Sequence, residues 1–158
     1  MPAQWLLLAH VIGATVLFGT GAGIAFFMVM AHPTRDPALI AHVAETVVIA
    51  DTVFTATAAL LQPVTGYLLA RSIGWDLTEG WIALSLLLYV FTGVFWLPIV
   101  WIQLRLRDLA RAAAASASAL PPANFSLYRA WFAFGFLAFS AVIGIFWLML
   151  TKPSIALF

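Results

Sequence analysis

The sequence contains no cysteine. This absence excludes disulfides, thiolate-ligated haem, iron–sulfur clusters and zinc sites built on cysteine. Charge is also scarce, because Asp, Glu, Lys and Arg together make up only 8% of the 158 residues and the formal net charge is +1. So small a net charge gives no electrostatic basis for binding nucleic acid, and we expect no nucleic-acid partner.

Residue patterns that identify enzymes are missing as well. We find no nucleophile–base pair, no glycine-rich phosphate-binding loop and no paired carboxylates at one depth. We therefore expect no catalytic residue in this chain and incline against an enzyme.

Apolar residues are in excess, at 65% of the chain, whereas a soluble domain has ~45–50%. The stretches 4–31, 44–71, 80–104 and 126–150 are each long enough to cross a bilayer. No Lys or Arg precedes the first of them, so we expect a retained helix rather than a signal peptide. The short connections favour an up-down-up-down arrangement. We predict an all-α, polytopic membrane protein with four transmembrane helices in one domain, residues 1–158.

Local signals mark the helix ends. Asp36 followed by Pro37 predicts a helix start, with a capping carboxylate and then proline at the first helical position. Gly74 is typical of a helix C-terminus. Residues Asp76–Glu79 have the spacing of a capping box, which predicts the start of the third helix. We expect the fourth helix to begin near Ser126.

The positions of Lys and Arg predict the orientation in the membrane. Five of the seven flank the first and third connections, namely Arg35, Arg105, Arg107, Arg111 and Arg129, and two, Arg71 and Lys152, lie on the other side. We therefore expect a bacterial inner-membrane protein with both termini in the periplasm. Seven aromatic residues near the span ends are expected to form interfacial belts: Trp5, Trp75, Trp81, Trp101, Tyr128, Trp131 and Trp147.

His10 is the anomalous residue of the first helix, because the stretch Trp5–Met30 has no formally charged residue. An ionisable group within a span is costly and marks a functional site by default. Helical spacing places it on one face with Gly13, Ala14, Leu17 and Gly21. An imidazole above small residues suits a macrocycle such as haem, and it also suits an ordinary helix contact. Nearby Gly19 and Gly23 form a small-xxx-small pair that permits close approach of a helix or a flat ligand.

A polar stripe runs along the second helix. Its members at helical spacing are Asp51, Thr55, Ala58, Gln62 and Thr65/Gly66. Its outer end is the part expected to meet His10. We expect Asp51 either to form a buried ion pair, with Arg105 or Arg129 as the cation, or to be a protonated group bonded to a neighbour.

Residues at the depth of His10 complete the candidate site. We expect His10, Gly13, Gln62 and Tyr89 to bind a cofactor, with His10 as the only strong metal ligand. Pro63 frees the carbonyl of Ala59 for a neighbour or a cofactor.

The remaining histidines lie elsewhere. His32 and His42 are expected to be solvated residues near the opposite end of the bundle, where with Glu45 they would make only a weak metal site.

The order of short motifs resembles a family of uncharacterised bacterial integral membrane proteins over nearly the whole chain. The motifs are Leu8-Ala9-His10, Gly19 to Gly23, Asp36-Pro37-Ala38, Thr65-Gly66-Tyr67, Gly74-Trp75, Trp81, Trp96-Leu97-Pro98 and Gln103 to Arg107. More distantly the chain is similar to HemJ-type protoporphyrinogen oxidases, which share a Leu-His pair and the closing Lys152-Pro153, and to CopD-like membrane proteins. This likeness implies a haem b site at His10. It does not extend to the oxidase reaction, because the HemJ-type His and Lys of the third helix are replaced here by Trp81-Ile82-Ala83-Leu84.

Three functional hypotheses follow from these features. The first is a membrane protein that binds haem b through His10. The second is a non-catalytic subunit of a larger membrane complex or homo-oligomer, in which His10 bonds to Gln62 or Tyr89. The third is a small transporter or metal-handling protein whose polar path is marked by Asp51 and His10.

Overall fold

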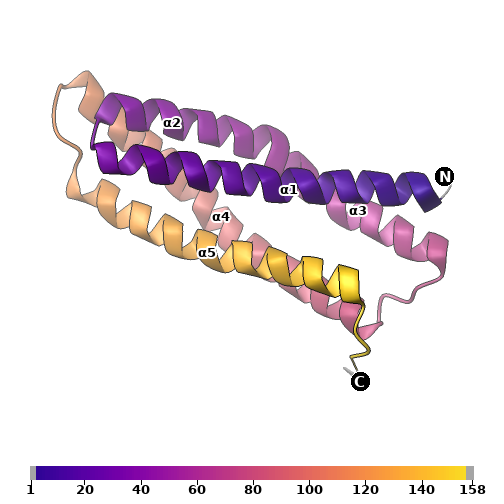
Figure 1. Ribbon diagram of the computed structural model, residues 1–158. Helices are drawn as coiled ribbons and strands as arrows, with labels where there is room; N and C mark the ends of the chain where they lie inside the picture. Colours follow the sequence, from indigo (N-terminus) through magenta and orange to yellow (C-terminus); the bar gives the residue numbers. More distant parts are fainter. Residues whose placement is uncertain (1–2, 156–158) are drawn as a thin grey trace.

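The computed structural model describes residues 3–155, and these residues form helices joined by short turns, with no strand among them (Figure 1). The elements are α1 (Ala3–Ala31), the 3₁₀ turn η1 (His32–Thr34), α2 (Pro37–Ala50), the π-helical segment η2 (Asp51–Thr55), α3 (Ala56–Ile73), α4 (Gly80–Ala115) and α5 (Pro122–Thr151). Segment η2 joins α2 to α3 without a break, so residues 37–73 form one long helix. The described part thus contains four helices long and apolar enough to span a membrane, which confirms the predicted all-α architecture.

The bundle has two ends. At the loop end, η1 and residues 116–121 connect neighbouring helices, and at the terminal end α1 begins, α5 ends and residues 74–79 join α3 to α4 (Figure 1). Helix α1 packs against α2 toward the loop end and against α3 toward the terminal end, while α4 packs along α5. The main core lies between α1, α2, α4 and α5. It contains Ile24, Met28, Ala44, Val47, Ile99, Ile102, Leu106, Trp131 and Ala138.

Two predicted helix ends are confirmed. Oδ1 of Asp36 accepts hydrogen bonds from the backbone N–H groups of Ala38 and Leu39, and Pro37 is the first residue of α2. Gly74 ends α3 in the left-handed conformation, with φ of 88°, a backbone geometry that glycine adopts without a Cβ penalty.

The start of α4 differs from the prediction. Oδ1 of Asp76 accepts from the backbone N–H and the hydroxyl of Thr78, and no side chain caps the helix, which begins at Gly80. Asp76 therefore makes a local turn instead of a capping box, and these bonds hold the pKa of its carboxyl below the ordinary value. Helix α5 also differs, because it begins at Pro122 and not near Ser126. Proline is well suited to a first helical turn, where its missing N–H costs nothing.

The exposure of the side chains is compatible with the belt prediction for only part of the aromatic set. Trp5, Trp101 and Trp147 are exposed, at 60%, 57% and 56%. Trp81 and Trp131 are instead buried core residues, at 8% and 4% exposure. Position near a span end did not distinguish them, because a tryptophan there can face lipid or the bundle interior.

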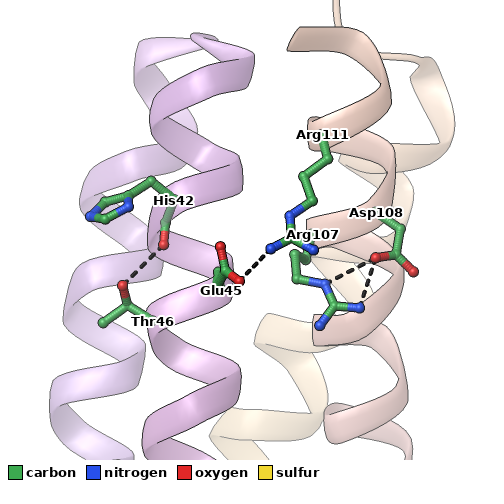
Figure 2. A network of polar contacts seen from close by, with 6 residues as sticks. All are labelled: His42, Glu45, Thr46, Arg107, Asp108 and Arg111. Carbon is green, nitrogen blue, oxygen red and sulfur yellow. Dashed lines mark hydrogen bonds and ion pairs between the residues drawn. The ribbon is translucent and has the colours of Figure 1, made fainter. Parts of the chain in front are cut away.

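An ion pair connects α2 and α4 near the loop end. Arg111 of α4 forms an ion pair with Glu45 of α2, and Arg107 pairs with the adjacent Asp108 (Figure 2). His42 lies one turn before Thr46, whose hydroxyl donates to the His42 carbonyl at 3.0 Å. Since the side chains of Glu45 and Arg111 are 45% and 46% exposed, water and salt screen their attraction, and the pair contributes little to stability.

Candidate functional site

His10 of α1 is held against α3. Its Nδ1 lies 2.9 Å from Oγ1 of Thr65, within a partly buried contact between residues far apart in the chain. The Thr65 hydroxyl also lies 2.9 Å from the carbonyl oxygen of Leu61, one turn earlier in α3. One hydroxyl proton serves one acceptor, so we assign it to Leu61 and the Nδ1 proton to His10. The Nε2 atom of the neutral ring then carries a lone pair.

Two glycines allow the helices to approach at this point. A Cβ at Gly66 would lie 3.0 Å from Cε1 of His10, and a Cβ at Gly13 would lie 3.1 Å from Oε1 of Gln62. Both distances are shorter than ordinary carbon contacts, which are about 3.5–4.0 Å. His10, Gly13, Gln62 and Thr65 thus form one cluster, hereafter the His10 cluster. The expectation that the outer end of the stripe meets His10 is confirmed.

Tyr89 of α4 does not join the His10 cluster through its hydroxyl. That hydroxyl donates to the carbonyl oxygen of Ala59 on α3, the group that Pro63 leaves without an N–H partner. The sequence indicated that this carbonyl has no N–H partner within its own helix. In the structure it accepts a hydrogen bond from the Tyr89 side chain instead. Tyr89 therefore links α4 to α3 where proline interrupts the helical hydrogen bonds.

Asp51 is the centre of a second buried cluster. Its side chain is 4% exposed, and Nε1 of Trp96 on α4 donates to Oδ1 and Oδ2 at 3.2 and 3.3 Å. With the amide of Gln103 oriented to satisfy both of its atoms, Nε2 donates to Oδ2 of Asp51 at 3.0 Å. The Gln103 oxygen then accepts from Nε1 of Trp131 on α5 at 3.2 Å. This Asp51 network joins η2, α4 and α5 through the N–H groups of Trp96, Gln103 and Trp131.

The ion pair predicted for Asp51 is wrong. Arg105 and Arg129 are both exposed, and within residues 3–155 neither forms a salt bridge with Asp51. A guanidinium at either position gains more from water than from a desolvated contact, while indole and amide N–H groups satisfy the carboxylate at lower cost. The contacts to Asp51 come from neutral N–H donors, and the alternative of a protonated Asp51 stays a prediction.

The glycine pair of α1 makes no close contact within the chain. A Cβ at Gly19, Gly21 or Gly23 would meet no atom of the described chain within 4 Å. Gly21 lies on the same face of α1 as His10, whereas Gly19 and Gly23 lie on the opposite side, so α1 presents an open small-residue surface on both sides. Lipid, another chain or a flat ligand could lie against it.

His32 is buried, so the prediction that it is solvated is wrong. It is 4% exposed, its ring stacks on that of Tyr128 with centroids 3.8 Å apart, and its Nδ1 lies 3.2 Å from the Met28 carbonyl oxygen. His42 is exposed, as expected. The weak metal site suggested for these residues with Glu45 does not form, because the described residues contain no cluster of three possible metal ligands.

The sequence did not predict the three other members of the Asp51 network, which are Trp96 and Gln103, the direct partners of Asp51, and Trp131, the partner of Gln103. A signal was present in α4, where Trp96 and Gln103 lie seven residues apart and so share a face. Trp131 gave no such signal, because its position near a helix end is equally typical of a lipid-facing belt. Thr65 was placed on the polar stripe but not as the partner of His10.

Comparison with known proteins identifies one family. Residues 4–153 match the family described as "Predicted integral membrane protein (DUF2269)". No curated protein and no solved structure matches the chain.

Proposed function

The chain belongs to this family of predicted integral membrane proteins, and we propose that it binds haem b through Nε2 of His10. The observation that carries the proposal is the 2.9 Å contact between Nδ1 of His10 and the Thr65 hydroxyl. Metal-ligating histidines almost always donate their other ring N–H to an acceptor, which fixes the tautomer and the ring orientation. The contact supplies such a partner inside a transmembrane helix.

The surroundings of His10 fit a flat macrocycle. Gly13 and Gly66 keep the imidazole and Gln62 close to the helices, and further along α1 a Cβ at Gly21 would meet nothing within 4 Å. Gly21 lies about 16 Å along the helix from His10, so the edge of a porphyrin ligated by His10 would extend along this apolar face of α1.

A single protein ligand follows from the placement of the histidines. His32 lies at the far end of α1, roughly 33 Å away at 1.5 Å per residue, and His42 is near the same loop end. The iron would therefore be five-coordinate or take its sixth ligand from a second chain. When bound, haem would supply redox or ligand-binding chemistry, and the part of this chain is to hold and orient one imidazole.

Absorption spectroscopy of the detergent-solubilised full chain tests this proposal. We expect a Soret band after expression with ample haem, and its loss in His10→Ala. His42→Ala is the matched control, because His42 is exposed and distant from the site. A folded, colourless protein that does not bind added haem would refute the proposal.

A second candidate function is that of a non-catalytic subunit of a membrane complex or homo-oligomer. The open face at Gly19 and Gly23 favours it, since close helix packing there requires another chain. Native electrophoresis after mild solubilisation should show a larger species that Gly19→Leu disrupts. Gly135→Leu is the control, because Gly135 on α5 is equally free of contacts. Migration only as a monomer would contradict this candidate.

We further propose that the protein lies in a bacterial inner membrane with its loop end in the cytoplasm. The five arginines near that end, against two cations at the other, support this orientation. Because the chain has no cysteine, single Cys substitutions at the exposed Ser118 and Ser154 can be labelled with an impermeant maleimide. In intact cells we expect the Ser154→Cys protein to be labelled and the Ser118→Cys protein to be protected. Labelling of the Ser118→Cys protein but not of the Ser154→Cys protein would show the opposite orientation.

A further inference from the structure

An open pocket lies at the loop end, separate from the His10 cluster and the Asp51 network. Its volume is about 230 Å³, and its lining residues are His32, Pro33, Arg35, Phe125 and Tyr128. They come from η1, the turn that follows it and the first two turns of α5. The pocket therefore stands where the hydrophobic helices end, at the level of a membrane–water interface.

Arg35 supplies a positive charge to the pocket. Its backbone takes the left-handed conformation, with φ of 55°, and its N–H donates to the His32 carbonyl oxygen at 3.2 Å. The Thr34 hydroxyl donates to the Ala31 carbonyl at 2.7 Å and accepts from the Asp36 N–H at 3.2 Å, which fixes the turn. The Arg35 guanidinium forms no salt bridge within the described residues and lies 5.9 Å from the centre of the Phe125 ring.

Neighbouring acids are already engaged. Asp36 caps α2, Glu45 pairs with Arg111, and Asp108 pairs with Arg107. Among the described residues of the loop end, Arg35, Arg105 and Arg129 therefore have no carboxylate partner. The uncompensated positive charge at this end favours an anion as the ligand.

Buried polar atoms beside the pocket also lack partners. Nε2 of His32 is buried without a hydrogen bond, and so are both amide atoms of Asn124, which precedes Phe125 in the chain. Their side chains are among the least exposed polar groups, with His32 at 4% and Asn124 at 0%. The Asn124 side chain is close enough to His32 to hydrogen-bond with it, so these two buried groups can satisfy each other, and the charge of Arg35 is the feature of the pocket that calls for a ligand.

We propose that this pocket binds the phosphate of an anionic phospholipid headgroup, with Arg35 as its charged contact. A guanidinium matches phosphate oxygens in geometry and charge. The rings of Phe125 and Tyr128 give the remaining wall an apolar, aromatic surface that suits the glycerol and first methylenes of a lipid. A free phosphate ion has no apolar part that could contact these rings, and therefore a lipid is the better source of the phosphate.

Native mass spectrometry of the full chain in neutral detergent, titrated with phosphatidylglycerol or phosphatidylcholine, tests the proposal. We expect one tightly retained phosphatidylglycerol and weaker retention of phosphatidylcholine. Arg35→Gln should weaken phosphatidylglycerol binding roughly tenfold to hundredfold, and Arg35→Lys should retain most of it. Arg129→Gln is the matched control, because it removes the same charge outside the pocket lining and should cost at most about fivefold.

Three results would overturn the proposal. Equal losses in Arg35→Gln and Arg129→Gln would mean diffuse attraction to a basic surface. Full displacement of the lipid by inorganic phosphate would mean that the site binds the free ion. Equal binding of both lipids would remove the role of charge. If Arg35→Gln does not fold, Phe125→Ala tests the same pocket through its aromatic wall and should also lower phosphatidylglycerol retention.

Discussion

Nδ1 of His10 and Oγ1 of Thr65 lie 2.9 Å apart, although the two residues are separated by 55 positions in the chain. This contact joins α1 to α3 and determines which ring nitrogen of His10 carries the lone pair. It is the structural basis of the proposed haem site, and it can be altered without removing the imidazole.

Thr65→Val should weaken haem binding while leaving the histidine in place. The substitution keeps the shape of the side chain but removes the acceptor for the Nδ1 proton, so the ring can rotate or change tautomer. Loss of such a partner typically costs ~10–100-fold in metal affinity. Haem titration followed at the Soret band measures the effect. Thr57→Val on the same helix, where the threonine is exposed, should bind like the unsubstituted protein, and equal weakening in both variants would contradict the role of Thr65.

Gly66→Ala should displace the imidazole. The new Cβ would be 3.0 Å from Cε1 of His10, and forcing an extra methyl into a packed site costs ~1–3 kcal/mol. Gly21→Ala adds the same methyl where nothing lies within 4 Å, and it should be neutral or slightly stabilising because alanine favours helix. Unfolding in mixed detergent micelles compares the two variants. Similar free energies of unfolding for both would mean that α1 and α3 are not closely packed at His10.

Tyr89→Phe should destabilise the protein through the carbonyl of Ala59. Without the Tyr89 hydroxyl, that partly buried acceptor has neither a helical N–H, because of Pro63, nor a side-chain donor. An unsatisfied buried group costs ~1–3 kcal/mol.

Pro63→Ala tests this explanation, because it restores the backbone N–H that can bond to Ala59. In a double-mutant cycle, the cost of Tyr89→Phe should be smaller on the Pro63→Ala background. Strict additivity of the two free-energy changes would show that Tyr89 does not act through the Ala59 carbonyl.

Asp51→Asn should disrupt the Asp51 network without changing the size of the side chain. The new amide nitrogen would face the N–H groups of Trp96 and Gln103, and one buried donor would lose its acceptor. We expect a loss of ~1–3 kcal/mol in stability and a change in the ultraviolet resonance Raman signal of the indole N–H. Asp108→Asn at an exposed ion pair should cost less than ~1 kcal/mol. If Asp51→Asn costs no more than this control, the network does not stabilise the bundle.

Much of the architecture was predictable, because local chemistry controls it. The four spans follow from apolar length, Asp36 and Pro37 fix the start of α2, and Gly74 fixes the end of α3. The meeting of His10 with the outer end of the polar stripe was also predictable, since helical spacing orders depth along each span.

Other features depend on which helices are neighbours, and a single sequence does not contain that information in local form. Trp131 and Trp81 are buried although their positions suit a lipid-facing belt, and His32 is covered by Tyr128 from a distant helix. The partners of Asp51 were mistaken for the same reason. The charged candidates were evident in the sequence, whereas the neutral donors Trp96 and Gln103 become partners only through packing.

Haem titration of His10→Gly, with and without added imidazole, tests the central claim most directly. We expect His10→Gly to show no Soret band with added haem and imidazole to restore it, because the free ring would occupy the vacated position and ligate the iron in place of His10. A Soret band that persists in His10→Gly without imidazole, or an unsubstituted protein that binds no haem, would contradict the proposal that His10 is the axial ligand.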